Sequence, residues 1–161
     1  MQLCGVIKNM YDDATVMEQP QEILVDVIGL GSGVVDRLAE QNLPVRGVNV
    51  AEAPATKKNY LNLRAELWFA IKDWLAQRDC RLPENDELAS ELAAPQYKYT
   101  SSGKIKIESK DEMRKRGIKS PDKADALALT MASSAASFSG SASYLGYNFK
   151  KPLKSRIFRV G

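Results

Sequence analysis

Two aspartates in apolar surroundings are the residues of this sequence best placed to do chemistry. Asp26 follows three aliphatic residues, and Asp125 lies among alanines and leucines in the segment from Ala124 to Leu129. An ionised carboxylate in such a setting is costly unless it accepts hydrogen bonds, pairs with a cation or binds a metal ion. Asp122 lies three residues before Asp125 and could share its role, or act only as a favourable charge in a first helical turn.

The chain has no histidine and two cysteines, Cys4 and Cys80, without a CxxC pair. This composition excludes histidine-based triads and bases, disulfide frameworks and cysteine-rich zinc sites. Any metal would therefore be held by oxygen atoms, which favours a hard divalent cation such as Mg²⁺, Mn²⁺ or Ca²⁺. Two carboxylates on different elements indicate such a site, because hydrolysis with bound metal ions needs no histidine.

A glycine-rich turn follows Asp26 and offers a different hypothesis. Gly29, Gly31 and Gly33 stand between a predicted strand and a predicted helix, and Glu52 follows 19 residues after Gly33. The spacing is GxGxG rather than the GxGxxG of dinucleotide-binding turns, so the pattern indicates a nucleotide cofactor only weakly. A dinucleotide-binding module nevertheless remains an alternative at this stage.

The elements that must carry these residues follow from hydrophobic patterning. Strand, helix and strand in short succession predict a βαβ unit with a parallel sheet, covered on both faces. Ser32 and Ser120 are candidate helix N-caps, with Pro121 at the first helical position. The expected helices are 1–17, 34–41, 60–78, 86–92 and 123–136; the expected strands are 23–28, 45–50 and a hairpin of 97–99 with 104–107.

The composition is that of one globular domain: 161 residues, 44% hydrophobic and 27% charged. No apolar run is long enough to span a membrane, and the first residues resemble neither a signal nor a transit peptide. Residues 1–100 carry 10 Lys+Arg and 15 Asp+Glu, whereas residues 101–161 carry 13 and 5, a net charge of +8. This asymmetry suggests a polyanionic partner, nucleic acid first, although a solvated basic surface would look the same.

Four segments, in matching order and spacing, resemble the C-terminal nuclease domain of the large terminase subunits of tailed phages. The resemblance covers roughly residues 1–135. It rests on ILVDVIGLGSGV at 23–34, VNV at 48–50, NLRAELW at 62–68 and SPDKADAL at 120–127. Such a domain has an α/β, RNase H-like fold. It would cut concatemeric double-stranded DNA during head packaging, with Mg²⁺ or Mn²⁺ held by carboxylates.

The resemblance assigns roles to individual residues. Asp26 and Asp125 would be catalytic metal ligands, and Asp122 a neighbouring metal ligand with a weaker claim. The basic residues on and after the predicted hairpin would guide the DNA backbone, unless they form only a solvated surface. They are Lys104, Lys106, Lys110, Arg114, Lys115 and Arg116.

The same resemblance leads to expectations about the rest of the protein. A further acid of the family lies on a first strand that would precede residues 1–17, and no Walker motif GxxxxGK[ST] is found. We therefore expect a partial nuclease domain over 1–136 with a flexible basic tail over 137–161. Its partners would be DNA, the phage portal and the small terminase subunit, in the cytoplasm of a bacterial host and away from membranes. An inactive prophage remnant that only binds DNA is the alternative.

Overall fold

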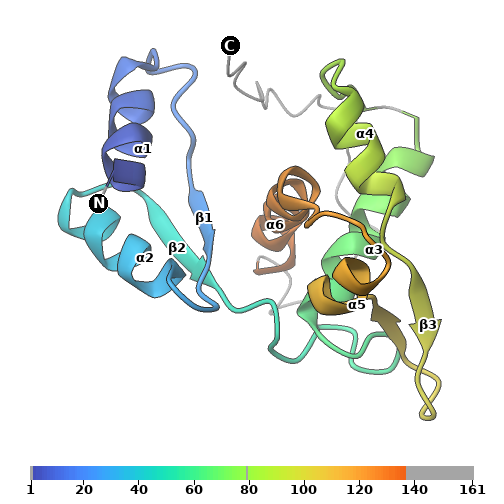
Figure 1. Ribbon diagram of the computed structural model, residues 1–161. Helices are drawn as coiled ribbons and strands as arrows, with labels where there is room; N and C mark the ends of the chain where they lie inside the picture. The colour runs from blue at the N-terminus through green and yellow to red at the C-terminus, as the bar shows by residue number, and fades with distance from the viewer. Residues whose placement is uncertain (1, 79, 137–161) are drawn as a thin grey trace. The chain divides into compact units, whose positions relative to one another are not determined.

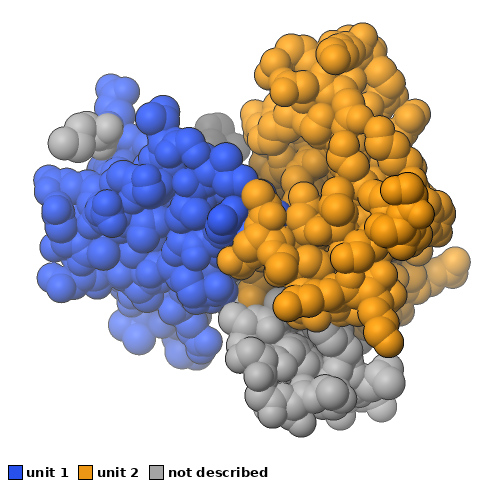
Figure 2. Space-filling model, turned by 90° about the horizontal axis from the view of Figure 1, so that it is seen from below, with its two compact units in different colours: residues 1–50 blue, residues 51–161 orange. Residues whose placement is uncertain are grey.

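The computed structural model describes residues 2–78 and 80–136, and the predicted tail at 137–161 lies outside that range. The chain divides into two compact units, residues 1–50 and 51–161 (Figure 2). Each unit is α/β in character, the first with a parallel strand pair and the second with an antiparallel hairpin. No helix within the described ranges is long and apolar enough to cross a bilayer.

Unit 1 contains the predicted βαβ arrangement, preceded by a helix (Figure 1). The helices are α1 (Gln2–Asp13) and α2 (Gly31–Glu40), and the strands are β1 (Ile23–Asp26) and β2 (Val45–Val48). The strands run parallel, with Ile23 opposite Val45 and Asp26 opposite Val48. Both strands are shorter than the expected 23–28 and 45–50. In β1 the apolar pattern continues past Asp26, but there the backbone already enters the turn that contains Gly29.

The core of unit 1 lies between its two helices and one face of the strand pair. Cys4 of α1 and Leu38 of α2 pack with Leu43, and Ile23 and Val25 contact this cluster. Because side chains alternate along a strand, Asp26 points to the opposite face from Val25. Asp26 therefore lies on the face of β1 that does not contribute to this core.

The turn between β1 and α2 differs from the expectation in where the helix starts. Helix α2 already begins at Gly31 and its N-cap is Leu30, which provides no side-chain hydrogen bond. The prediction of Ser32 as N-cap is thus wrong. A Cβ at Gly31 would lie 1.7 Å from the carbonyl oxygen of Asp26, so the chain can enter the helix early only because residue 31 is glycine.

Unit 2 is built around the packing of three helices (Figure 1). They are α3 (Leu63–Ala76), α4 (Asp86–Ala93) and α6 (Asp122–Ala136). The side chains of Asn62 and Asn85 cap α3 and α4. Ala124, Ala128 and Ala132 are buried at intervals of four residues, which gives α6 a smooth stripe toward its neighbours. Helix α3 confirms the helix expected within 60–78, and its apolar residues Leu63, Leu67 and Ile71 are buried along one stripe.

The predicted hairpin is confirmed as β3 (Tyr97–Tyr99) and β4 (Ile105–Ile107), antiparallel, with Tyr99 opposite Ile105. The charged stretch after it contains a helix that the sequence interpretation missed, α5 (Lys110–Lys115). The hydroxyl of Ser109 accepts from the Glu112 amide while the Glu112 carboxylate accepts from the Ser109 amide. This capping box, S-x-x-E, was the available signal.

Helix α6 begins at Asp122, one residue before the predicted range of 123–136, and its cap differs from the prediction. The carbonyl of Pro121 accepts the first intrahelical hydrogen bond, from the amide of Asp125 at 2.7 Å. Pro121 therefore occupies the cap position, and the prediction of Ser120 as N-cap is wrong. The amides of Lys123 and Ala124 instead donate to the carboxylate of Glu91 on α4, at 2.7 and 2.9 Å. A neighbouring helix thus supplies the cap that holds the start of α6.

Candidate active site

Asp125 lies in the first turn of α6, and several donors from other elements hold its carboxylate. Its Oδ1 accepts from the indole Nε1 of Trp68 at 3.0 Å and from Nη2 of Arg64 at 3.2 Å. Its Oδ2 lies 3.2 Å from the ammonium of Lys110. The side chain is 20% exposed. Its orientation is therefore fixed, while one face remains open to solvent.

Two residues of α3 that carried no predicted role create this arrangement. Arg64 and Trp68 are four residues apart, so both side chains leave α3 on the same face. Nη1 of Arg64 also donates to the carbonyl of Glu108 at 2.7 Å, which ties α3 to the segment after β4. Their i,i+4 spacing in the NLRAELW segment was the signal in the sequence. Only the fold reveals that they converge on Asp125, which follows Arg64 by 61 residues and Trp68 by 57.

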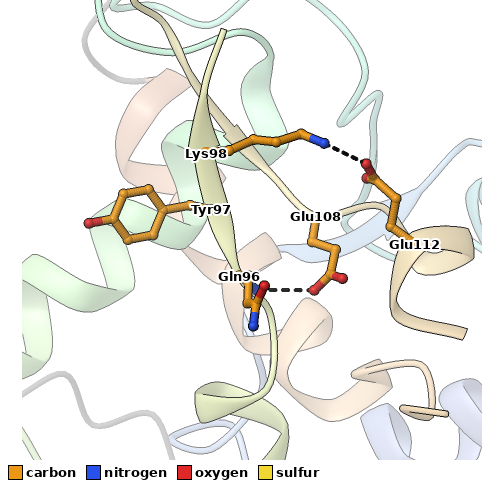
Figure 3. A pocket seen from close by; sticks show the side chains of 5 residues that line it. All are labelled: Gln96, Tyr97, Lys98, Glu108 and Glu112. Carbon is orange, nitrogen blue, oxygen red and sulfur yellow. Dashed lines mark hydrogen bonds and ion pairs between the residues drawn. The ribbon is translucent and has the colours of Figure 1, made fainter. Parts of the chain in front are cut away.

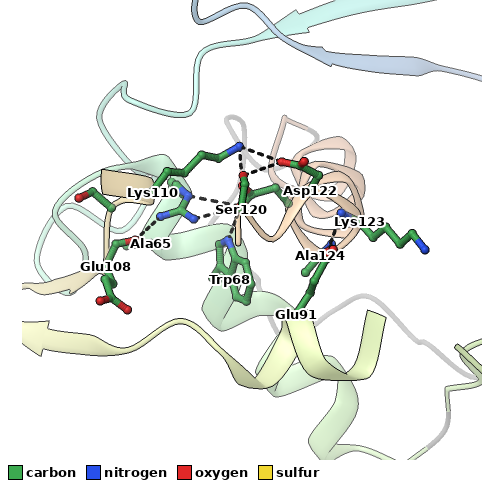
Figure 4. A network of polar contacts seen from close by, with 12 residues as sticks. Ala65, Trp68, Glu91, Glu108, Lys110, Ser120, Asp122, Lys123 and Ala124 are labelled. Carbon is green, nitrogen blue, oxygen red and sulfur yellow. Dashed lines mark hydrogen bonds and ion pairs between the residues drawn. The ribbon is translucent and has the colours of Figure 1, made fainter. Parts of the chain in front are cut away.

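Asp122 lies beside Asp125 but in a more open environment, with a side chain that is 76% exposed. The hydroxyl of Ser120 donates to its Oδ1 at 2.6 Å, and Lys110 lies 3.4 Å from the same oxygen. The Ser120 hydrogen bond, with a further contribution from Lys110, lowers the pKa of Asp122 below its ordinary value. Lys110 thus contacts both carboxylates, and its side chain and that of Asp122 can be followed in Figure 4.

Asp26 is the last residue of β1 in unit 1. Its Oδ1 accepts from the amide of Ile28 at 3.0 Å, a local turn that ends the strand. It stands at the carboxyl end of a parallel strand, where α/β sheets place their ligand sites. Asp26 and Asp125 belong to different compact units, so a metal ion shared by the two stays a prediction.

The donor set has the chemistry of a hard-cation site, although it is sparse. Asp122 and Asp125 offer carboxylate oxygens, the ligands that Mg²⁺ and Mn²⁺ accept. Within residues 2–78 and 80–136, no group of three or more acidic residues or cysteines is arranged to hold an ion. The cation nearest to both carboxylates is the ammonium of Lys110. It would have to give up at least one of these contacts if a metal ion took that place.

The six basic residues predicted to guide DNA divide into different environments. Arg116 holds Glu108 through two hydrogen bonds of 2.6 and 2.7 Å and donates to the carbonyl of Ala94. Lys106 lies 3.6 Å from Glu112, and Arg114 pairs with Asp111 at 2.9 Å. The side chains of Lys104 and Lys115 take part in no hydrogen bond or ion pair with the described residues. Arg116 is therefore engaged in contacts that hold the fold together. The side chains of Lys104 and Lys115 remain available to contact DNA.

A small cavity of about 150 Å³ lies between the hairpin and α5 (Figure 3). It is lined by Gln96, Tyr97, Lys98, Glu108 and Glu112. Lys98 pairs with Glu112 at 2.7 Å, and the amide of Gln96 donates to Glu108 at 3.2 Å. Bonding to Lys98 and to the amide of Ser109 holds the pKa of Glu112 well below its usual range. These charges satisfy one another and fasten the hairpin to α5.

Solved structures of phage nuclease domains share this fold. Two structures of a variant nuclease domain of the large terminase subunit gp2 of bacterial virus Sf6 superimpose with TM-score 0.61 at 23% identity. One was solved with manganese and the other with manganese and beta-thujaplicinol. A third, with calcium, gives TM-score 0.60 at 24% identity.

The superposition covers 70% of this chain and 65% of the first of those domains. A scan against protein-family models finds no match, and a search of the curated proteins finds none. The likeness confirms the expected fold class, α/β and RNase H-like, including the parallel strand pair, the helices and the hairpin.

Proposed function

We propose that this chain is the nuclease part of a phage DNA-packaging enzyme, a large terminase subunit that cuts concatemeric double-stranded DNA with divalent metal ions. The fold shared with phage terminase nuclease domains supports this proposal. The observation that carries it is the Asp125 carboxylate, oriented by Trp68 and Arg64 yet partly open to solvent. This carboxylate is thus held in one orientation before a metal ion binds, and part of it stays accessible to such an ion.

In this proposal Asp26 and Asp125 are the catalytic metal ligands, and Asp122 is an additional one. When bound, Mg²⁺ or Mn²⁺ would activate the attacking water and stabilise charge on the phosphodiester. The chain's own residues prepare the site. Arg64 and Trp68 fix the direction of the Asp125 carboxylate, and Lys110 keeps Asp122 and Asp125 close before any ion arrives. Manganese or calcium accompanies the similar domains, which agrees with a divalent ion.

The chain spans 65% of the length of the first similar domain, so the packaging role and its partners are part of the proposal. The portal and the small terminase subunit would be those partners, in the bacterial cytoplasm. Two-ion cleavage needs several carboxylates around ions roughly 3.5–4 Å apart. The described residues offer no group of three. We therefore expect slow cleavage by this chain alone.

The decisive experiment incubates the full chain with supercoiled plasmid in Mn²⁺, in Mg²⁺ and in EDTA. We expect slow, EDTA-sensitive nicking in Mn²⁺ that falls to background in Asp26→Asn and in Asp125→Asn. Asp36→Asn is the matched control, because Asp36 is an exposed acid of α2 and should leave the rate unchanged. DNA binding without any cleavage would instead identify a DNA-binding remnant. Binding of a nicotinamide or flavin cofactor would favour the dinucleotide module.

A further inference from the structure

A cleft of about 370 Å³ lies in unit 2 beside the Asp122–Asp125 pair. It is formed by α5 and by the connection from α5 to α6. No carboxylate is among its lining residues, which are Lys110, Arg114, Gly117, Ile118, Lys119 and Ser120. Three of these six carry a positive charge, so the composition of the wall favours an anion.

The chain reverses at Gly117 to form this wall. Gly117 has a φ of 76°, a left-handed conformation that favours glycine after a helix. Its amide donates to the carbonyl of Arg114 at 2.9 Å, and the amide of Ile118 donates to the carbonyl of Met113 at 3.0 Å. Met113 is fully buried and anchors α5. The wall is therefore held by backbone hydrogen bonds and by the core, rather than by long side chains alone.

Two of the three cations are available to a ligand. Among the residues that the structure describes, Arg114 pairs only with Asp111, and the two side chains are 76% and 80% exposed. Such surface pairs contribute little and exchange readily. Lys119 makes no hydrogen bond or ion pair with the described residues, although its charge helps to lower the pKa of Glu87. An anion in the cleft would thus not compete with a buried salt bridge.

Lys110 connects the cleft to the candidate active site. It lines the cleft, and its ammonium lies 3.2 Å from Asp125 and 3.4 Å from Asp122. We propose that the cleft binds a backbone phosphate of duplex DNA next to the phosphodiester presented to Asp125, with Lys119 and Arg114 as its principal contacts. This inference rests on the proposed function and assigns part of the DNA to a particular place. Phosphate contacts of this kind fix the register of the strand without selecting sequence.

The test compares Lys119→Gln and Arg114→Gln with Lys58→Gln in the full chain. Lys58 is the matched control, since it is an exposed lysine of unit 2 that does not line the cleft and carries no proposed DNA contact. The dissociation constant of a fluorescent duplex is measured by anisotropy over a series of salt concentrations. We expect each cleft variant to bind several-fold more weakly and to flatten the slope of log K against log salt by about 0.9. Lys58→Gln should keep the wild-type slope.

Equal slopes for Lys119→Gln and Lys58→Gln, in variants whose circular dichroism matches wild type, would overturn the proposal. So would a shift of the Ile118 amide resonance on addition of inorganic phosphate without any change in the DNA slope, because the cleft would then be a free-phosphate site. Neither result would touch the proposed nuclease function, which depends on metal-dependent cleavage lost in Asp125→Asn. If that cleavage is absent but Lys119→Gln still changes the slope, the phosphate site is supported and the proposed nuclease function is wrong.

Discussion

Asp125 shows how single residues determine this site. Its carboxylate lies where an unpaired charge would be costly, and α3 supplies the partners that make it tolerable. Arg64 is 15% exposed and serves both Asp125 and the carbonyl of Glu108. Losing it would leave the carbonyl of Glu108 without this donor and Asp125 without one of its two charged partners, which costs more than the loss of one exposed ion pair.

We expect Arg64→Met to lower the free energy of unfolding by about 1–3 kcal/mol, because a partly buried carboxylate loses one of its two charged partners and the carbonyl of Glu108 loses its donor. Arg37→Met is the matched control, since Arg37 pairs with Glu40 on the surface of α2. That exposed pair should contribute only about 0–1 kcal/mol. Urea denaturation followed by circular dichroism measures both variants. Equal losses would contradict the structural role of Arg64.

The backbone conformation at Asp26 requires a glycine at position 31. A Cβ at Gly31 would meet the backbone of Asp26, whereas one at Gly33 would meet nothing within 4 Å. We expect Gly31→Ala to destabilise the protein by about 1–3 kcal/mol through this clash. Gly33→Ala should instead stabilise by about 0.5–1 kcal/mol, because alanine is the better helix residue. Thermal unfolding would show opposite shifts; shifts of the same sign would argue against this geometry.

At the scale of elements, α4 supplies the N-terminal cap of α6. The Glu91 carboxylate accepts from two backbone amides at the start of α6, while Glu87, one turn earlier on α4, pairs with the exposed side chain of Lys123. We expect Glu91→Ala to cost about 1–2 kcal/mol, the loss of a helix cap and of a favourable charge at the helix start. Glu87→Ala should cost clearly less than Glu91→Ala, because its pair with Lys123 lies on the surface. Urea titrations measure the free energy of unfolding of both variants. Equal losses would show that only the negative charge of α4 matters and not the cap formed by Glu91.

The hairpin and α5 are joined by carboxylates whose folded-state pKa values are low. Hydrogen bonding to Lys98, and then to the Ser109 amide, lowers the pKa of Glu112; Arg116 lowers that of Glu108. A lowered folded pKa contributes stability that is complete above the unfolded value, about 4.3 for glutamate, and is lost as the pH falls below it.

We therefore expect the wild-type free energy of unfolding to decrease as the pH falls below about 4.3. In Glu112→Gln this decrease should be smaller, because the variant has one fewer carboxylate to protonate. Urea denaturation at a series of acidic pH values, with neutral pH as reference, measures the difference. A variant with the full wild-type pH dependence would contradict the assignment of Glu112 to this junction.

At the scale of the whole molecule, charge is distributed unevenly along the chain. Residues 101–161 carry a net charge of +8, against 15 acids and 10 bases in residues 1–100. We expect duplexes of unrelated sequence to bind with similar affinity and with a steep loss of affinity as salt rises, because phosphate contacts release counterions. Anisotropy titrations with two duplexes of different composition test this. Binding that is insensitive to salt would exclude an electrostatic interface.

The sequence by itself determined what local physics controls. The βαβ order, the hairpin turn, the apolar stripe of α3 and the isolation of Asp26 and Asp125 in apolar segments all follow from periodicity and residue type. The boundaries were less predictable: β1 ends at Asp26 although Val27 and Ile28 continue the pattern, since the backbone turns there toward α2. Helix α5 was overlooked because its charges concealed a capping box.

The tertiary structure alone decided which distant residues meet. Arg64 and Trp68 converge on Asp125, Glu91 caps a helix more than 30 residues ahead, and Arg116 turns inward to Glu108 while Lys119 lines a cleft. None of these contacts has a local signature, because a long side chain of a given type can pair, cap or remain solvated with similar free energy. Packing of α3, α4 and α6 selects among these outcomes by fixing which backbones lie within reach.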